Sequence, residues 1–274
     1  MRTFARVWMA GLLAVGGAGL LAGTPGCGVF SPATIRGTKT AQAPHVPGSG
    51  LDIATSNGSV TVTVAPGEEV QITAEIRALS QARLDATMLG VERSDDGTLS
   101  VRVQWPEGRR HSNEGCSIDL RVPDASGVVV DTGNGSITLA GAAGQATLST
   151  SNGSITVSDH SGPVSATTSN GSVNLRDVGT VRAKSSNGRI TVVLRNDVAG
   201  PVHCDTSNGS ITLEFGTAFD ALVDADTSNG GVTVAGPSLQ VVKSGKSSGS
   251  FKFGAGTHPS RLDTSNGSIT IRPR

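Results

Sequence analysis

The sequence predicts an all-β protein, a parallel β-solenoid of coils about 17–21 residues long with an N-terminal β cap. Two observations predict this fold. The motif Ser-Asn-Gly-Ser, or a close variant, occurs eight times, and apolar and polar residues alternate on both sides of it. In the central array successive Asn residues are 18, 18, 17, 21 and 21 positions apart, a range typical of stacked supersecondary units. The repeated pairs are Asn57-Gly58, Asn134-Gly135, Asn152-Gly153, Asn170-Gly171, Asn187-Gly188, Asn208-Gly209, Asn229-Gly230 and Asn266-Gly267.

The composition favours a repeat protein over a conventional mixed core. The 274 residues include 37 glycines and no tyrosine, and aromatic residues make up only 3% of the chain. Without its first 26 residues, which contain two arginines and no acid, the chain has 20 basic residues against 22 acidic ones. Phosphate binding requires a basic surface, so we expect no nucleic-acid partner.

The N-terminus has the pattern of an export signal. Residues 1–26 contain an early basic part and an apolar, Gly- and Ala-rich stretch over residues 7–22. Cys27 follows and resembles the lipid-modified cysteine of bacterial lipoproteins, although residues 24–26 depart from the usual pattern. We expect an exported, lipid-anchored protein of the bacterial cell envelope; the alternative is ordinary cleavage and a periplasmic or secreted product. Residues 27–49 are rich in Pro, Gly, Ser and Thr and are expected to form a flexible tether.

Each repeat predicts a strand, a turn and a second strand. After Asn152, for example, Ile155 and Val157 are apolar while Thr156 between them is polar, and the other copies repeat this alternation. We expect the Asn-Gly pair to supply the positive φ angles of a tight turn. An antiparallel meander of hairpins is the alternative fold. The solenoid is favoured because both flanks of the turn stay constant, and stacked Thr, Ser and Asn side chains can form hydrogen-bonded ladders.

Residues 50–125 are expected to hold the first repeat and a cap of longer strands. A short helix is predicted between Leu79 and Leu89. Ser80 is its expected N-cap, and Leu79 and Leu84 form a hydrophobic pair at its start. Such a region suits the end of an array, since terminal units need a different outer face.

Residues 126–274 are predicted to form the repeat array. Its longest gap contains residues 247–253, which are expected to form a degenerate coil with Ser248 in the position of Asn. The chain ends with Arg272-Pro273-Arg274, and we expect this charged, Pro-containing end to protect the open edge of the last coil.

The chain resembles a bacterial family of β-strand-repeat envelope proteins described as adhesin-like, whose domain is of otherwise unknown function. The resemblance rests on Leu120-Arg121-Val122-Pro123, followed by copies of Thr-Ser-Asn-Gly-Ser-Ile-Thr-Val, and spans residues 50–274. It implies an envelope-associated, non-enzymatic protein, and no catalytic residue is carried over.

Two cysteines and a column of acids are the main candidates for chemistry. Cys116 and Cys204 share the parity of apolar neighbours, so we expect buried packing residues, with a disulfide between them as the alternative. An acidic residue also occurs three positions before several Asn residues. Stacking could join Asp205 and Asp226 in a calcium site, but we favour solvated surface residues, because other copies hold Ala, Ser, Thr or Lys there.

Other motifs are incomplete. Gly245-Lys246-Ser247 resembles the end of a phosphate-binding loop, but Gln240 occupies the position of its first glycine. The five histidines are scattered without metal-ligand spacing. The sequence therefore predicts no catalytic residue, no metal and no cofactor.

These observations favour one of three functions. The favoured one is a non-enzymatic structural or adhesive surface on a tether, with an unidentified envelope or surface partner and end-to-end self-association as a variant. The alternative is a binding or sensory module that recognises a protein or glycan through the cap around residues 105–116, with Trp105, Arg109 and Arg110 as contacts. A polysaccharide-cleaving enzyme is disfavoured, because no cluster of acids and bases is found.

Overall fold

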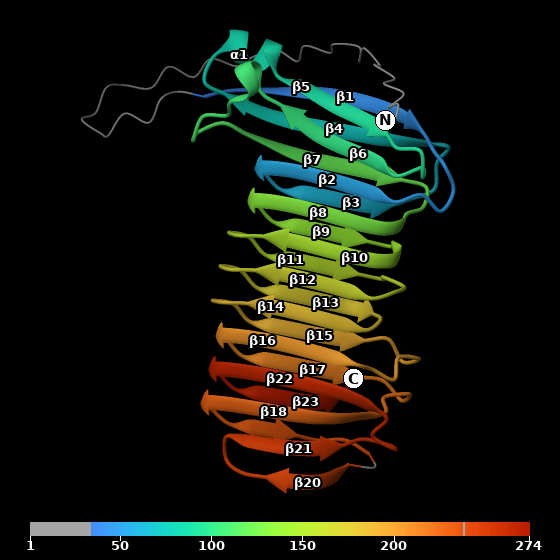
Figure 1. Ribbon diagram of the computed structural model, residues 1–274, viewed down its shortest axis with the longest axis vertical. Helices are drawn as coiled ribbons and strands as arrows, with labels where there is room; N and C mark the ends of the chain where they lie inside the picture. The colour runs from blue at the N-terminus through green and yellow to red at the C-terminus, as the bar shows by residue number, and fades with distance from the viewer. Residues whose placement is uncertain (1–33, 238) are drawn as a thin grey trace, which may run out of the picture.

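Two long β-sheets face each other along the whole molecule (Figure 1). The computed structural model describes residues 34–237 and 239–274. The all-β prediction is confirmed, because these ranges contain 23 strands, one short α-helix and one 3-10 turn. The predicted export signal and Cys27 lie outside the described residues. Within the described ranges, no helix has the length and apolar character needed to cross a membrane.

We call the sheets A and B. Sheet A has 11 strands. Their spatial order is β1 (Ile35–Pro44), β4 (Glu69–Ala78), β7 (Gly115–Val122), β3 (Val60–Val64), β9 (Ile137–Ala140), β11 (Ile155–Ser158), β13 (Val173–Val178), β15 (Ile190–Leu194), β17 (Ile211–Phe215), β23 (Ile269–Pro273) and β19 (Val232–Val234).

Sheet B has 12 strands. Their spatial order is β20 (Gln240–Ser244), β21 (Ser248–Lys252), β18 (Ala221–Asn229), β22 (His258–Asn266), β16 (Val202–Asn208), β14 (Val181–Ser185), β12 (Val164–Thr168), β10 (Ala143–Thr150), β8 (Ser126–Asn134), β2 (Leu51–Asn57), β6 (Leu99–Gln104) and β5 (Met88–Arg93). Helix α1 covers Gln81–Ala86, and the 3-10 turn η1 covers Pro106–Gly108.

The array is a parallel solenoid, so the hairpin alternative is wrong. Each coil supplies one strand to sheet B, turns at Asn-Gly and supplies the next strand to sheet A. Equivalent residues of neighbouring coils are in register: Ile155 pairs with Val173 in sheet A, and all strand pairs from β8 to β16 are parallel. The inward apolar side chains of both sheets are buried in one continuous core, as the period of two requires.

The N-terminal cap changes the direction of pairing. Strands β1 and β4 run antiparallel to their neighbours beside β7, and β5 runs antiparallel to β6. Helix α1 confirms the predicted helix, with the Ser80 hydroxyl accepting a hydrogen bond from the Arg83 amide at 3.3 Å and Leu84 buried. The helix is shorter than predicted, because Thr87 is already extended and leads into β5.

The predicted tether is wrong for residues 35–44. These residues form β1, which pairs with β4 over its full length. Its composition resembled a linker because its exposed positions are polar, whereas Gly37 lies against Leu84 and Ala43 is buried. The partner strand comes much later in the chain, so the local pattern did not reveal the pairing.

The C-terminal end of the array is also different from the prediction. The chain forms the coil of β18 and β19 first, and then returns to insert β22 and β23 between this coil and that of β16 and β17. Arg272-Pro273-Arg274 therefore ends inside the stack and does not cover its edge. Ser248 lies in β21, which runs antiparallel to β18, so residues 247–253 are not a degenerate coil.

Three phenylalanines pack where the chain steps past the inserted coil. Phe215 lies 4.8 Å from Phe219 and 4.8 Å from Phe253 between ring centroids, and Phe219 lies 5.4 Å from Phe253. All three are buried. Their burial gives the stepped connection a small apolar core of its own.

Candidate functional site

The eight Asn-Gly pairs form one long polar corner, where sheet B turns into sheet A. Every corner Asn except Asn57 donates through its amide to the side-chain oxygen of the Asn in the neighbouring coil nearer the cap. The distances are 2.6 Å for Asn134 to Asn57, 2.7 Å for Asn152 to Asn134, 2.8 Å for Asn170 to Asn152, 2.9 Å for Asn187 to Asn170, 2.9 Å for Asn208 to Asn187, 2.8 Å for Asn266 to Asn208 and 2.9 Å for Asn229 to Asn266. The ladder is continuous through the inserted coil.

A second ladder runs beneath the first. Sequence analysis expected ladders of Thr and Ser side chains, but it did not predict that buried hydroxyls before each Asn would donate to the backbone. The residue two positions before each Asn is Thr or Ser, and its hydroxyl donates to a backbone carbonyl of the neighbouring coil. These residues are Thr55, Thr132, Thr150, Thr168, Ser185, Thr206, Thr264 and Thr227. All but Thr55 are buried. The signal was present in the constancy of this hydroxyl position, since a buried polar group needs a partner.

The corner glycines are required for a reason other than the predicted one. None of the eight has a positive φ angle. A Cβ on any of them would instead lie 1.8–2.2 Å from a carbonyl oxygen of the neighbouring coil. The coils approach so closely at this corner that only glycine fits.

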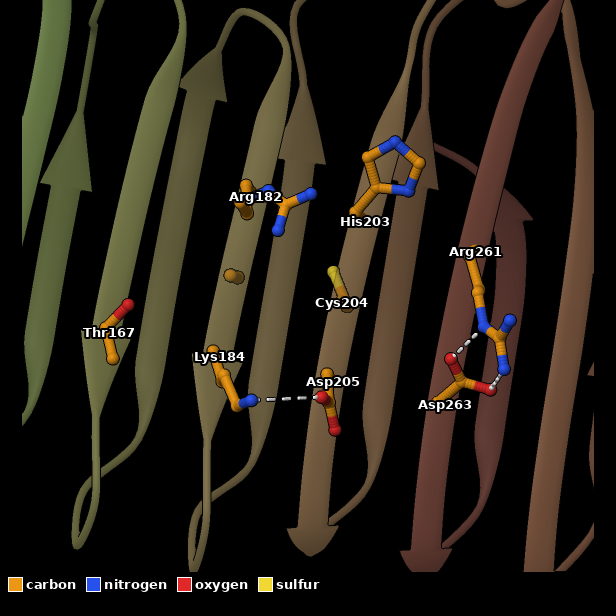
Figure 2. A pocket seen from close by; sticks show the side chains of 9 residues that line it. Thr167, Arg182, Lys184, His203, Cys204, Asp205, Arg261 and Asp263 are labelled. Carbon is orange, nitrogen blue, oxygen red and sulfur yellow. Dashed lines mark hydrogen bonds and ion pairs between the residues drawn. The ribbon is translucent and has the colours of Figure 1, made fainter.

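The outer face of sheet B has a charged hollow of about 430 Å³ (Figure 2). Lys184 Nζ lies 3.5 Å from Asp205, and Arg261 binds Asp263. His203 lies beside Arg182 in the same hollow, and its pKa is lowered by burial and by the charge of Arg182. The hollow is open, and four of its charged side chains are already paired, Lys184 with Asp205 across strands and Arg261 with Asp263 within β22, so it can make polar surface contacts.

The structure does not place Asp205 beside Asp226. The inserted strand β22 puts Asp263 between them, because Asp205 pairs with Asp263 and Asp226 pairs with Asp263 from the other side. Asp205 and Asp263 already have cationic partners. The described residues contain no group of three or more His, Cys, Asp or Glu side chains that could hold a metal ion.

Cys116 and Cys204 are free and buried, and they do not form the alternative disulfide. Burial raises the pKa of each thiol to about 12, with a further contribution at Cys116 from Glu75. A thiol of this kind carries almost no thiolate at neutral pH and is a poor nucleophile. Both cysteines therefore act as packing residues.

A buried carboxylate organises the loop between β6 and β7. The Glu114 side chain is 0% exposed and binds Arg83 through distances of 2.6 and 2.9 Å. It also accepts hydrogen bonds from the backbone amides of His111 and Leu79, at 2.9 and 3.4 Å. These bonds hold the pKa of Glu114 at about 2, against an ordinary value of 4.5.

The three predicted contacts in this loop have different environments. Trp105 packs against the core. Arg110 donates to the backbone carbonyls of His111 and Glu114, each at 2.8 Å. The side chain of Arg109 is exposed. Of the three, Arg109 is therefore the one that a partner could contact directly.

A second hollow, of about 620 Å³, lies where the cap meets the first coil. Arg36 and Arg77 are directly opposite each other on β1 and β4, and Thr38 is opposite Glu75. Arg77 also donates to the Asn113 carbonyl at 3.0 Å. This group of polar side chains can hydrogen-bond a ligand, but the hollow is open to solvent.

The fold and these surfaces define a class of protein, a β-solenoid with a hydrogen-bonded polar corner and a charged outer face. The family model described as Toastrack DUF4097 matches residues 94–272, so the chain belongs to this family. No curated protein matches the sequence.

Several solved structures are similar over most of their length. A proposed cell adhesion protein from Clostridium sporogenes is 9% identical, with 87% of this chain and 100% of that chain covered and a TM-score of 0.39. A proposed adhesin from Bacteroides fragilis is 10% identical, with coverages of 89% and 98% and a TM-score of 0.41. A proposed lipid binding protein from Parabacteroides distasonis is 12% identical, with coverages of 86% and 96% and a TM-score of 0.31.

Proposed function

We propose that this protein is a non-enzymatic component of the bacterial cell envelope, a rigid solenoid that presents a repeated polar surface for adhesion or structural support. The observation that supports this most is the corner, where Asn recurs in register over eight coils and Ser precedes it in seven of them. Neighbouring strands are about 4.8 Å apart. A surface that offers the same groups at such intervals suits a repetitive partner, since many weak contacts add to one strong attachment.

The ionisable groups fit this function better than catalysis. The two described thiols are buried with pKa values of about 12. Glu114 is held ionised by Arg83 and by backbone amides inside the cap. A general base works best with a pKa near the working pH, and these groups have pKa values far from it.

The location of the protein is the second part of the proposal. Export by residues 1–26 and a lipid on Cys27 would hold the array at a membrane of the envelope. Cells that express the full chain should retain it in the membrane fraction, and the Cys27→Ser variant should move to the soluble fraction. Recovery of both forms in the soluble fraction would contradict the anchor.

Capture of isolated cell envelopes by the purified full chain tests the adhesive surface. Deletion of residues 153–170 removes one complete coil, and we expect capture to change by less than about two-fold, because the remaining coils repeat the same surface. Arg109→Ala should likewise change capture by less than about two-fold. No capture by the unaltered chain would overturn the adhesive proposal.

A binding module in the cap is the second candidate. The rigid loop around Glu114 favours it, because preorganised loops bind at lower entropic cost. If Arg109→Ala alone abolishes capture while the coil deletion preserves it, the cap is the binding site. Arg109 is the cleanest probe of this loop, because changes at Trp105 or Arg110 would also disturb its packing.

A further inference from the structure

Both ends of sheet B have a strand edge without a partner among the described residues. At one end, all five residues of β20 are exposed, and Val241 and Val242 are 57% and 63% exposed. At the other end β5 pairs only with β6, and Met88 is 48% exposed. An unpaired edge with apolar side chains is a ready template for another strand.

The two ends of the molecule are stepped in opposite directions. Beyond the last coil, β18 and β19, sheet B continues with β21 and β20 while sheet A stops. Beyond the layer of β6 and β7, sheet A continues with β4 and β1, whereas sheet B adds only β5. Copies stacked end to end would therefore interlock, with one strand position left open in sheet A. Leu239, just before β20, packs against the core.

The segments around the two outer strands of sheet B also carry opposite charge. Residues 230–257 contain Lys243, Lys246 and Lys252 and no acid. Residues 85–98, around β5, contain four acids (Asp85, Glu92, Asp95 and Asp96) against the single base Arg93. None of these lysines and acids forms a salt bridge with another described residue. Complementary charges steer association and select the partner end.

We propose that this protein assembles head to tail, with β20 of one copy pairing with β5 of the next copy. Strand β20 runs in the direction of β18 and β2, and β5 runs against it. Translation along the stack therefore brings the two edges together as an antiparallel pair. Lys243 and Glu92 both lie on the outer face of sheet B, where they pair in register with Ser250 and Ser100.

This contact uses different surfaces on the two copies, so it does not close into a dimer and can extend into a linear array. The inference deepens the proposed function, because an array of solenoids would extend the same repeated surface. Its test measures self-association alone and needs no envelope partner. Failure of the assembly would leave the adhesive proposal standing, and failure of envelope capture would leave the assembly standing.

Sedimentation velocity of the purified full chain in detergent tests the proposal over a wide range of protein concentrations. We expect a series of oligomers that grows with concentration. The series should shrink at high salt, since raising the ionic strength from about 0.1 to 1 M shortens the screening length from about 10 to 3 Å. Lys243→Glu and Glu92→Lys should each weaken association roughly ten-fold, and the double variant should restore it.

Arg189→Glu is the matched control, because Arg189 is exposed in the middle of the array. It should leave association unchanged. A chain that stays monomeric at every concentration would overturn the proposal. A double variant that does not regain association would also overturn the proposal. Loss of association in Lys243→Glu but not in Glu92→Lys would point to a two-fold contact between β20 strands, and it would also overturn the head-to-tail arrangement.

Discussion

Each position of the corner motif has its own physical task. The Asn amide joins neighbouring coils at the surface, the Thr two positions earlier joins them in the interior, and glycine allows the close approach. A single hydrogen bond contributes only about 0.5–1.5 kcal/mol net. The ladders therefore stabilise the stack through repetition, whereas each glycine avoids a clash with the backbone of the neighbouring coil.

The glycine requirement can be tested with Gly153→Ala. The new Cβ would lie 2.0 Å from the Gly135 carbonyl oxygen, so the coils must separate locally. We expect the free energy of unfolding in urea to fall by about 2–4 kcal/mol. Gly231→Ala is the control, because its Cβ would meet no atom within 4 Å, and it should change stability by less than about 1 kcal/mol. Equal losses in the two variants would refute the steric explanation.

Among the elements, the cap contains an ion pair with a fully buried carboxylate, that of Glu114 and Arg83. The pKa of Glu114 falls from 4.5 to about 2 on folding. A depressed carboxyl pKa stabilises the fold fully above the unfolded value, and this contribution is lost as the pH falls toward the folded value. The pair therefore stabilises the cap at neutral pH and ceases to do so in strong acid.

We predict that Glu114→Gln lowers the free energy of unfolding by about 2 kcal/mol at neutral pH, because it removes charged hydrogen bonds. The difference from the unaltered chain should shrink between pH 4.5 and about 2. Urea unfolding followed by the fluorescence of Trp105 would report on this region. Glu68→Gln, at an exposed position, should show no such pH-dependent difference. A difference for Glu114→Gln that stays constant with pH would contradict the assigned pKa.

The inserted coil gives a second prediction for the elements. Leu262 is fully buried in β22, between β16 and β18, although it is close to the chain end. Leu262→Ala should cost about 2–5 kcal/mol, as in an interior core. Val234→Ala, in the true terminal strand β19 of sheet A, should cost about 1 kcal/mol or less. The reverse ranking in urea unfolding would mean that the coils stack in chain order.

For the whole molecule, the sequence predicts the stack but not the order of its last coils. The alternation and the Asn spacing define strands, corners and parallel stacking. The segments around Asn229 and Asn266 carry nearly the same motif, so the motif alone allows either to pack on β16, and the structure places the segment of Asn266 there. The role of glycine was missed for a similar reason, since the two atoms that nearly collide belong to different coils.

The modular stack leads to a prediction about deletions. Removing residues 153–170 joins Asn152 to Gly171, and Asn187 can then donate to Asn152 in the register that Asn170 now has. Because each coil contacts only its neighbours, stability should fall by no more than the share of one coil. The molecule should stay folded and shorten by one strand spacing, about 4.8 Å.

Small-angle scattering and circular dichroism would check this outcome. Removal of residues 153–162 is the control, because it deletes β11 but keeps β12. The chain would then reach the next strand of sheet B without first supplying one to sheet A. We expect this variant to lose much of the array, because the sheet A strands on either side of the deleted β11 would lose their neighbour and the ladder bonds to it. If the full-coil deletion were as damaging as the half-coil deletion, the coils would not be the independent units of this fold.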